Sequence, residues 1–269
     1  MKNDFFSVES IRDVVILRIR GNPLYALVDL QAKAALFDCM DAIDSRDDIR
    51  VMVILGPAEK PDYKEYVDFF RHIRGNRKAV HAKGDITCLA DLDTLAKFCN
   101  AVNQLALKFV RSSKFVIHAD SGLIISPFMN LSLACDYRIV GQDSYYKNPY
   151  LELGLVPKGG SAFFLTRLIG YRNALKVLLA DNPMSADESL KLGLVDQVVP
   201  AGEIYDAAIK TAQRYADFPS TSLSGIKSLM NCSVADLQDC LKREDELFTR
   251  IINSSAFIDK TAVSKVAVK

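Results

Sequence analysis

LSLACDYRIVGQDSYYKNPYLELGLVPKGGSAFFLTRLIG, residues 131–170, is followed closely by LLADNPMSADESLKLGLVDQVVP, residues 178–200. In the first segment, DYRIVG (136–141) is predicted as a strand. In the second, SADESLKLG (185–193) has a Ser N-cap, acidic residues in its first turn and a terminal Gly, which predict a helix. LVDQVVP then predicts a last short strand. Strand, helix and strand in this order indicate a parallel sheet with helical crossovers.

The rest of the chain extends this pattern in both directions. Strands are predicted at 13–21, 49–56 and 114–119, and helices at 27–45 and 89–113. Residues 57–87 are polar and irregular, and no element is predicted there. Residues 202–256 contain two or three amphipathic helices after the last strand, so we expect a separate helical layer or a subunit contact. The predicted division is an α/β core, residues 1–201, and a C-terminal helical region, residues 202–269.

The composition excludes several classes of protein. The 269 residues are 49% hydrophobic and carry a formal net charge of +1, with only a small basic segment at 72–83. Neither nucleic acid nor a membrane is therefore an expected partner. The six cysteines form no C-x-x-C pair, which argues against structural zinc or any other metal site. The N-terminal segment has no apolar stretch of the length of a signal peptide, so we expect a cytoplasmic protein.

Residues 131–200 resemble the crotonase (enoyl-CoA hydratase/isomerase) superfamily. Its members read L-A-L-A-C-D-x-R-I, then F-x-x-P-E-x-x-L-G-L-x-P-G-G-G, then S-A-x-E-A-x-x-x-G-L-V-x-x-V-V-P. The order and spacing match over about 70 residues without a gap. The resemblance implies a crotonase-like spiral of ββα repeats whose C-terminal helices build a homotrimer, often stacked as a hexamer.

The resemblance also implies an acyl-CoA thioester, or a related small molecule, as ligand. No separate cofactor is implied, because coenzyme A enters as part of the substrate. In the family, two backbone N–H groups stabilise an enolate-like oxyanion, and one or two glutamates transfer protons.

This sequence departs from the family at those positions. ADSGLIISPFMNLSLACD (119–136) matches A-V-N-G-x-A-x-G-G-G-x-E-L-A-L-A-C-D, so the central Gly, which gives an oxyanion N–H, becomes Pro127. Proline has no N–H, although it is tolerated in the first turn of a helix, which should survive. The two family glutamates fall on Asn130 and Tyr150. A phenol is a poor base near neutral pH but a possible acid.

Two further elements are altered. If PDYKE (61–65) matches A-D-L-K-E, the other oxyanion position falls on Pro61, which again has no N–H. GNPLYALVD (21–29) resembles R-P-x-x-x-N-A-L with residues missing and no basic side chain. Ala26 and Leu27 there, with Ser126, are predicted to contact the ligand.

Several polar residues could line the expected pocket, and each has a plainer alternative. Tyr146 is either a catalytic residue or a packing residue, and His118 is either in the site or a satisfied histidine at a strand end. Lys158, which interrupts P-G-G-G, is either catalytic or a solvated loop residue. Glu152 could replace the second glutamate, or could be a surface or ion-paired residue.

Two functions remain open from the sequence. One is a divergent crotonase-type lyase or isomerase that acts on or binds an acyl-CoA with non-standard residues. The other is a catalytically inactive paralogue that serves as a binding or assembly subunit. Loss of both glutamates and of both N–H donors favours the second function.

Overall fold

The computed structural model describes residues 4–57, 60–74 and 92–254, and its centre is a six-stranded sheet. The strand order is β1-β2-β3-β4-β6-β9, and all pairs are parallel except the β1–β2 hairpin. This confirms the mainly parallel sheet expected from the sequence. The strands are β1 (Phe6–Ile11), β2 (Val14–Ile19), β3 (Val51–Leu55), β4 (Phe115–Asp120), β6 (Tyr137–Gly141) and β9 (Gln197–Val199).

A smaller second sheet lies next to the first. It has the order β5-β7-β8, with β5 and β7 parallel and β7 and β8 antiparallel. Its strands are β5 (Leu123–Ile125), β7 (Tyr145–Lys147) and β8 (Met184–Ser185). A connection of two residues joins β4 to β5, so the chain passes from the large sheet into the small one near residue 121.

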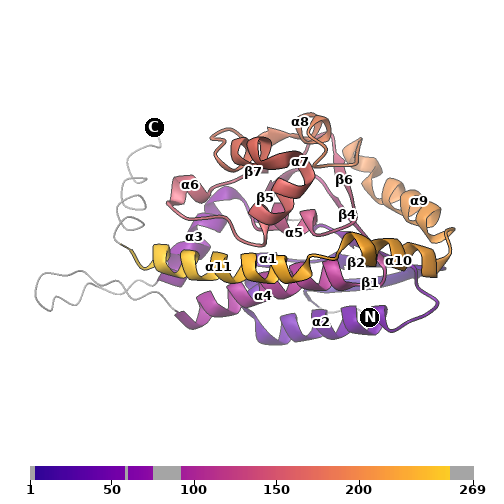
Figure 1. Cartoon of the computed structure of the whole chain (residues 1–269). Coiled ribbons are helices and arrows are strands. Elements are labelled where there is room, and N and C mark those ends of the chain that lie inside the picture. The colour runs from indigo at the N-terminus through magenta and orange to yellow at the C-terminus, as the bar shows by residue number, and fades with distance from the viewer. Residues whose placement is uncertain (1–3, 58–59, 75–91, 255–269) are drawn as a thin grey trace, which may run out of the picture.

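Helices cover both faces of the large sheet (Figure 1). α9 (Ile204–Ala216) packs its alanines against β2, β3, β4 and β6 on one face. On the other face, α1 (Pro23–Val28), α2 (Leu30–Asp44) and α4 (Leu92–Arg111) enclose the larger core. The remaining helices are α3 (Tyr63–Arg74), α5 (Phe128–Leu133), α6 (Tyr150–Leu153), α7 (Ser161–Leu178), α8 (Ala186–Lys191), α10 (Ser220–Met230) and α11 (Val234–Ile252), with the short 3-10 helix η1 (Ala201–Glu203).

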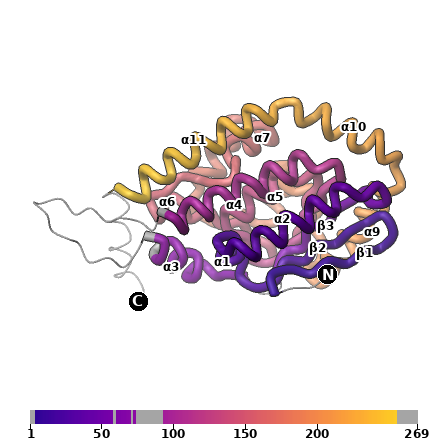
Figure 2. The backbone as a smooth tube through the Cα atoms, turned by 90° about the horizontal axis from the view of Figure 1, so that it is seen from below, coloured from indigo at the N-terminus to yellow at the C-terminus, as the bar shows by residue number. Residues whose placement is uncertain are grey.

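The C-terminal helices run back over the same chain. α11 lies alongside α4 in both views and also contacts α7 (Figure 2). Its buried face contains Leu237, Leu241, Phe248 and Ile252, which join the larger core. Three α-helices, α9, α10 and α11, follow the last strand, in agreement with the two or three expected from the sequence. The proposed division of the chain at residue 201 stays a prediction.

Two sequence predictions for the helices were wrong in detail. The helix expected over 27–45 is two helices, because Asp29 has extended backbone angles and its side chain accepts a hydrogen bond from the Ala32 N–H, which starts α2. The stretch expected to be irregular contains α3. Its buried residues Tyr66, Phe69, Phe70 and Ile73 follow the helical spacing, despite the charged residues between them.

The α8 segment follows its prediction closely. Ser185 caps the helix in a capping box with Glu188, and Gly193 after the helix has φ +77°. Most of the basic segment 72–83 lies outside the described residues. Over the described part of the chain, no helix is long and apolar enough to cross a membrane.

Candidate functional site

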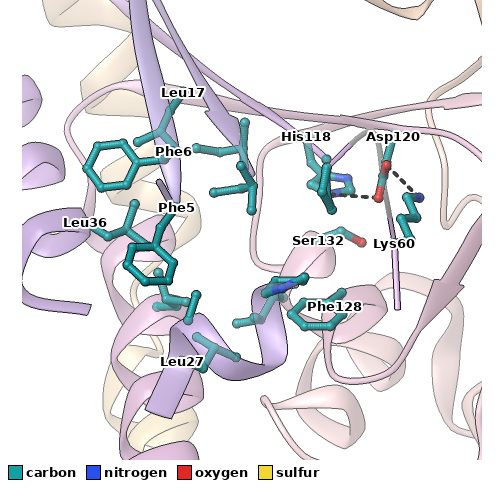
Figure 3. A pocket seen from close by; sticks show the side chains of 18 of the residues that line it. Phe5, Phe6, Leu17, Leu27, Leu36, Lys60, His118, Asp120, Phe128 and Ser132 are labelled. Atoms are coloured by element: carbon teal, nitrogen blue, oxygen red, sulfur yellow. Dashed lines mark ion pairs between the residues drawn. The ribbon is translucent and has the colours of Figure 1, made fainter. Parts of the chain in front are cut away.

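An apolar cavity of about 120 Å³ lies between the large sheet and the helices α1, α2, α4 and α5. Three neighbouring strands of the large sheet form one side of the cavity. The register of β2, β3 and β4 aligns Leu17, Ile54 and His118, and all three side chains line the cavity. Phe5, Phe6, Leu36 and Phe128 are among the apolar side chains around it (Figure 3). Such a cavity suits an apolar ligand group.

Some of the residues predicted from the sequence face this cavity. Ala26 and Leu27 on α1 line it, and so does Pro61, which precedes α3. Ser126 and Pro127 are not among the lining residues, although their neighbours Ile125 and Phe128 are. The segment that carries the predicted oxyanion and ligand positions therefore borders the cavity.

Pro127 stands at the N-cap of α5, which begins at Phe128, so the helix expected to survive at this position is present. The Pro127 carbonyl accepts a hydrogen bond from the Leu131 N–H at 2.8 Å. The helix is therefore kept, while the residue at its start has no N–H to offer a ligand. Pro61 is likewise buried and without an N–H.

Asn130 and Tyr150 do not line the cavity; they form a hydrogen-bonded cluster with the Lys158 backbone. Asn130 Nδ2 donates to the Lys158 carbonyl at 2.7 Å and lies 3.4 Å from the Tyr150 hydroxyl. The Lys158 N–H donates to the same hydroxyl at 3.2 Å. Burial raises the pKa of Tyr150 far above its ordinary value. The phenol therefore stays neutral at physiological pH.

Lys158 is buried, with 1% of its surface exposed, so the solvated-loop alternative is wrong. Its Nζ lies 2.6 Å from Asp245 Oδ1, 2.6 Å from Asn103 Oδ1 and 3.8 Å from Glu244 Oε2. Glu244 Oε2 also accepts the Gly160 N–H at 3.0 Å. These contacts join the loop before α7 to α11 and α4, which is a structural role.

Burial raises the pKa of Glu244 to about 7, although Lys158 and the Gly160 N–H oppose the shift. The carboxyl group is therefore partly protonated near neutral pH. Because it is enclosed between α11 and the loop before α7, its titration acts on the packing of the C-terminal helix.

Tyr146 and Glu152 are not among the residues that line the cavity. Tyr146 is buried in the larger core, in agreement with the packing alternative, and burial raises the pKa of its phenol. Glu152 is ion-paired with Lys147 at 3.3 Å and hydrogen-bonded to the Tyr63 hydroxyl. The ion-paired alternative for Glu152 is the one that the structure shows.

The polar end of the cavity consists of Lys60, His118 and Asp120 (Figure 3). Lys60 Nζ lies 2.7 Å from Asp120 Oδ1 and donates to the Ser121 carbonyl. His118 Nε2 lies 4.0 Å from Asp120 Oδ2. His118 Nδ1 is buried and has no hydrogen-bond partner among the described residues, so His118 is not the satisfied histidine considered above.

Burial sets the charge states at this end. Desolvation lowers the pKa of His118 to about 3, and the nearby Lys60 and Arg138 cations act in the same direction, so the imidazole is neutral. Burial raises the pKa of Asp120, while the Lys60 ammonium lowers it. Asp120 packs directly on Gly56, where an added Cβ would lie 1.9 Å from its Oδ1 atom.

Lys60 and Asp120 were missed from the sequence alone. One signal was available for Asp120, because HAD at 118–120 places His118 and Asp120 two residues apart on one face of a strand. Lys60 follows a different strand, and only the fold brings it to Asp120. Among the described residues, no group of three or more His, Cys, Asp and Glu side chains could hold a metal ion.

Comparisons with known proteins agree with this fold. The chain is 28% identical over 232 residues to the Mycobacterium avium (strain 104) protein named "Probable enoyl-CoA hydratase echA17", covering 84% of this chain and 83% of that protein. It is 27% identical over 196 residues to the Escherichia coli (strain K12) 2,3-dehydroadipyl-CoA hydratase, covering 70% of this chain and 77% of the enzyme.

Solved structures show the same fold at lower identity. The enoyl-CoA hydratase from Bacillus halodurans superposes with a TM-score of 0.76 at 17% identity, covering 96% of this chain and 99% of that one. The sequence model described as "Enoyl-CoA hydratase/isomerase" matches residues 74–262, which is well over half of the chain. This chain therefore belongs to the enoyl-CoA hydratase/isomerase family, the crotonase superfamily expected from residues 131–200.

Proposed function

We propose that this chain binds an acyl-CoA thioester with its acyl group in the apolar cavity and does not hydrate enoyl-CoA by the two-glutamate route. The cavity itself supports binding, since it is lined by apolar side chains and closed by a few polar groups. The relatives named as hydratases of 2,3-dehydroadipyl-CoA and of short-chain enoyl-CoA have CoA thioesters in their names, which favours the same ligand class here.

One observation carries the second half of the proposal. The side chains at both glutamate positions, Asn130 and Tyr150, are bonded to each other and to the backbone of Lys158, outside the cavity. Neither is a carboxylate that could activate water near pH 7. The prolines at positions 61 and 127 offer no backbone N–H for an oxyanion.

A divergent lyase or isomerase is the second candidate function. One observation favours it over an inactive binding or assembly subunit. Three ionisable side chains, those of Lys60, His118 and Asp120, are enclosed at one end of an apolar cavity, and such enclosure is common at functional sites. No cofactor other than the coenzyme A of the ligand is proposed.

We further propose a homo-oligomer, a trimer or a hexamer, with α10 in the contact. Ile226, Leu229 and Met230 on this helix are 62%, 79% and 72% exposed. Three neighbouring apolar side chains at such exposure favour a protein–protein contact. The cytoplasmic location expected from the sequence stays a prediction.

Thermal unfolding with hexanoyl-CoA and with free CoA tests ligand binding. At about 100 times the dissociation constant, a ligand stabilises the folded chain by about 2.7 kcal/mol. For a chain of this size, the melting temperature should rise by roughly 5–10 °C. Hexanoyl-CoA should raise it more than free CoA, because the cavity receives the acyl group. A melting temperature unchanged by either compound at millimolar concentration would refute the proposal.

A further inference from the structure

The apolar cavity has two polar features whose hydrogen-bonding capacity is not used within the described chain. Lys60 Nζ contacts Asp120 Oδ1 and the Ser121 carbonyl, which use two of the three N–H donors of an ammonium group. His118 Nδ1 is buried and unpartnered among the described residues. Buried polar atoms without partners are costly, so a polar ligand group at this place would be stabilising.

The charges at this end of the cavity favour a neutral ligand oxygen over a carboxylate. The Lys60 cation is already balanced by the Asp120 carboxylate, and His118 is neutral, since burial holds its pKa low. A ligand carboxylate would add a second anion beside Asp120, whereas the other lysine that lines the cavity, Lys33 on α2, donates to Asn100 on α4. A neutral oxygen that accepts one hydrogen bond fits this end better.

A simple acyl thioester has one such oxygen near its apolar chain, the thioester carbonyl. We propose that Lys60 donates a hydrogen bond to this carbonyl oxygen and so supplies the donor that Pro61 and Pro127 cannot give. The inference rests on the proposed acyl-CoA binding. It assigns to one side chain the role that backbone N–H groups would otherwise have.

The geometry around Lys60 supports this assignment. The residue directly precedes Pro61, and both line the cavity together with Phe128, the residue after Pro127. Asp120 holds the ammonium group in place and is itself fixed by packing on Gly56 and by the Ser121 N–H at 2.9 Å. The donor is therefore preorganised before a ligand enters, which reduces the entropic cost of binding.

The test compares two ligands that differ in one oxygen. Hexanoyl-CoA has the carbonyl group, and S-hexyl-CoA, a thioether, has a methylene group in its place. Titration calorimetry should show that the wild type binds hexanoyl-CoA more tightly than S-hexyl-CoA. The variant Lys60→Met should bind hexanoyl-CoA roughly ten- to a hundredfold more weakly, because a hydrogen bond from a charged donor is lost. Its affinity for S-hexyl-CoA should change less than threefold.

Two further variants control for folding. Lys60→Met leaves the Asp120 carboxylate buried without its partner, so the double variant Lys60→Met/Asp120→Asn removes both charges and should show the same selective loss. Lys108→Met removes another lysine that is ion-paired with an aspartate, outside the cavity, and should bind both ligands as the wild type does.

Each result has a distinct meaning. Equal losses for the two ligands in both Lys60 variants, or no loss, would overturn the role of Lys60 and leave acyl-CoA binding intact. If the folded wild type binds neither ligand, the proposed function fails together with this inference.

Discussion

Glu244 offers a quantitative test of the buried contacts around Lys158 and the loop before α7. Its carboxyl group lies against the Gly160 N–H and 3.8 Å from Lys158 Nζ, and burial raises its pKa from 4.5 to about 7. A group whose pKa is higher in the folded state stabilises the protein when it is protonated. That stability is fully present below about pH 4.5 and is lost as the pH rises through 7.

The pKa difference gives the size of the effect. A shift from 4.5 to about 7 corresponds to about 3 kcal/mol of unfolding free energy. In Glu244→Gln the side chain stays neutral, and its amide oxygen can still accept from Gly160. The unfolding free energy of the variant should therefore not fall in this way between pH 5 and pH 8. Relative to the wild type, it should rise by up to about 3 kcal/mol over this range.

Urea unfolding at pH 5, 6, 7 and 8 measures this difference. With a typical dependence on urea, the two midpoints should separate by about 1 M or more across this range. Glu246→Gln, an exposed position on the same helix, is the matched control and should follow the wild type. If Glu244→Gln and the wild type lose stability in parallel from pH 5 to pH 8, the described environment of Glu244 is wrong.

Three other predictions follow from the packing. The double variant Asn130→Glu/Tyr150→Glu should not hydrate crotonyl-CoA, since both positions lie outside the cavity; ordinary turnover in an absorbance assay would contradict this expectation. Its unfolding free energy should be about 3–5 kcal/mol lower, because both new carboxylates would be buried. Gly56→Ala should lower the urea midpoint, because its Cβ would collide with a buried carboxylate, whereas Gly202→Ala, with open space around it, should not. Leu229→Asp should reduce the mass measured by light scattering if α10 forms the oligomer contact; a wild type that is already monomeric across a broad concentration range would contradict the oligomer itself.

The fold was readable from the sequence wherever one signal dominated. The buried runs of β3 and β4 and the regular spacing of α4 were assigned because burial repeats with a single period there. α3 was missed because its apolar face is narrow and alternates with charged residues, so the stretch looked polar on average. The break at Asp29 was missed because a capping aspartate fits an amphipathic helix equally well.

The site was harder to predict, for a physical reason. A family pattern places Asn130 and Tyr150 at the expected positions, but only packing decides whether a side chain faces the cavity or the core. Here both face a buried cluster with Lys158. Lys60 and Asp120 are 60 residues apart in sequence, and their contact depends on the order of the strands.

The decisive measurement is the rate of crotonyl-CoA hydration at concentrations at which calorimetry shows the compound to be bound. The wild type should bind the compound saturably, and the enoyl thioester absorbance should fall no faster than at the uncatalysed rate. Turnover in the ordinary range for enzymes, about 1–1000 per second, would contradict this expectation, because groups other than Asn130 and Tyr150 would then have to activate the water.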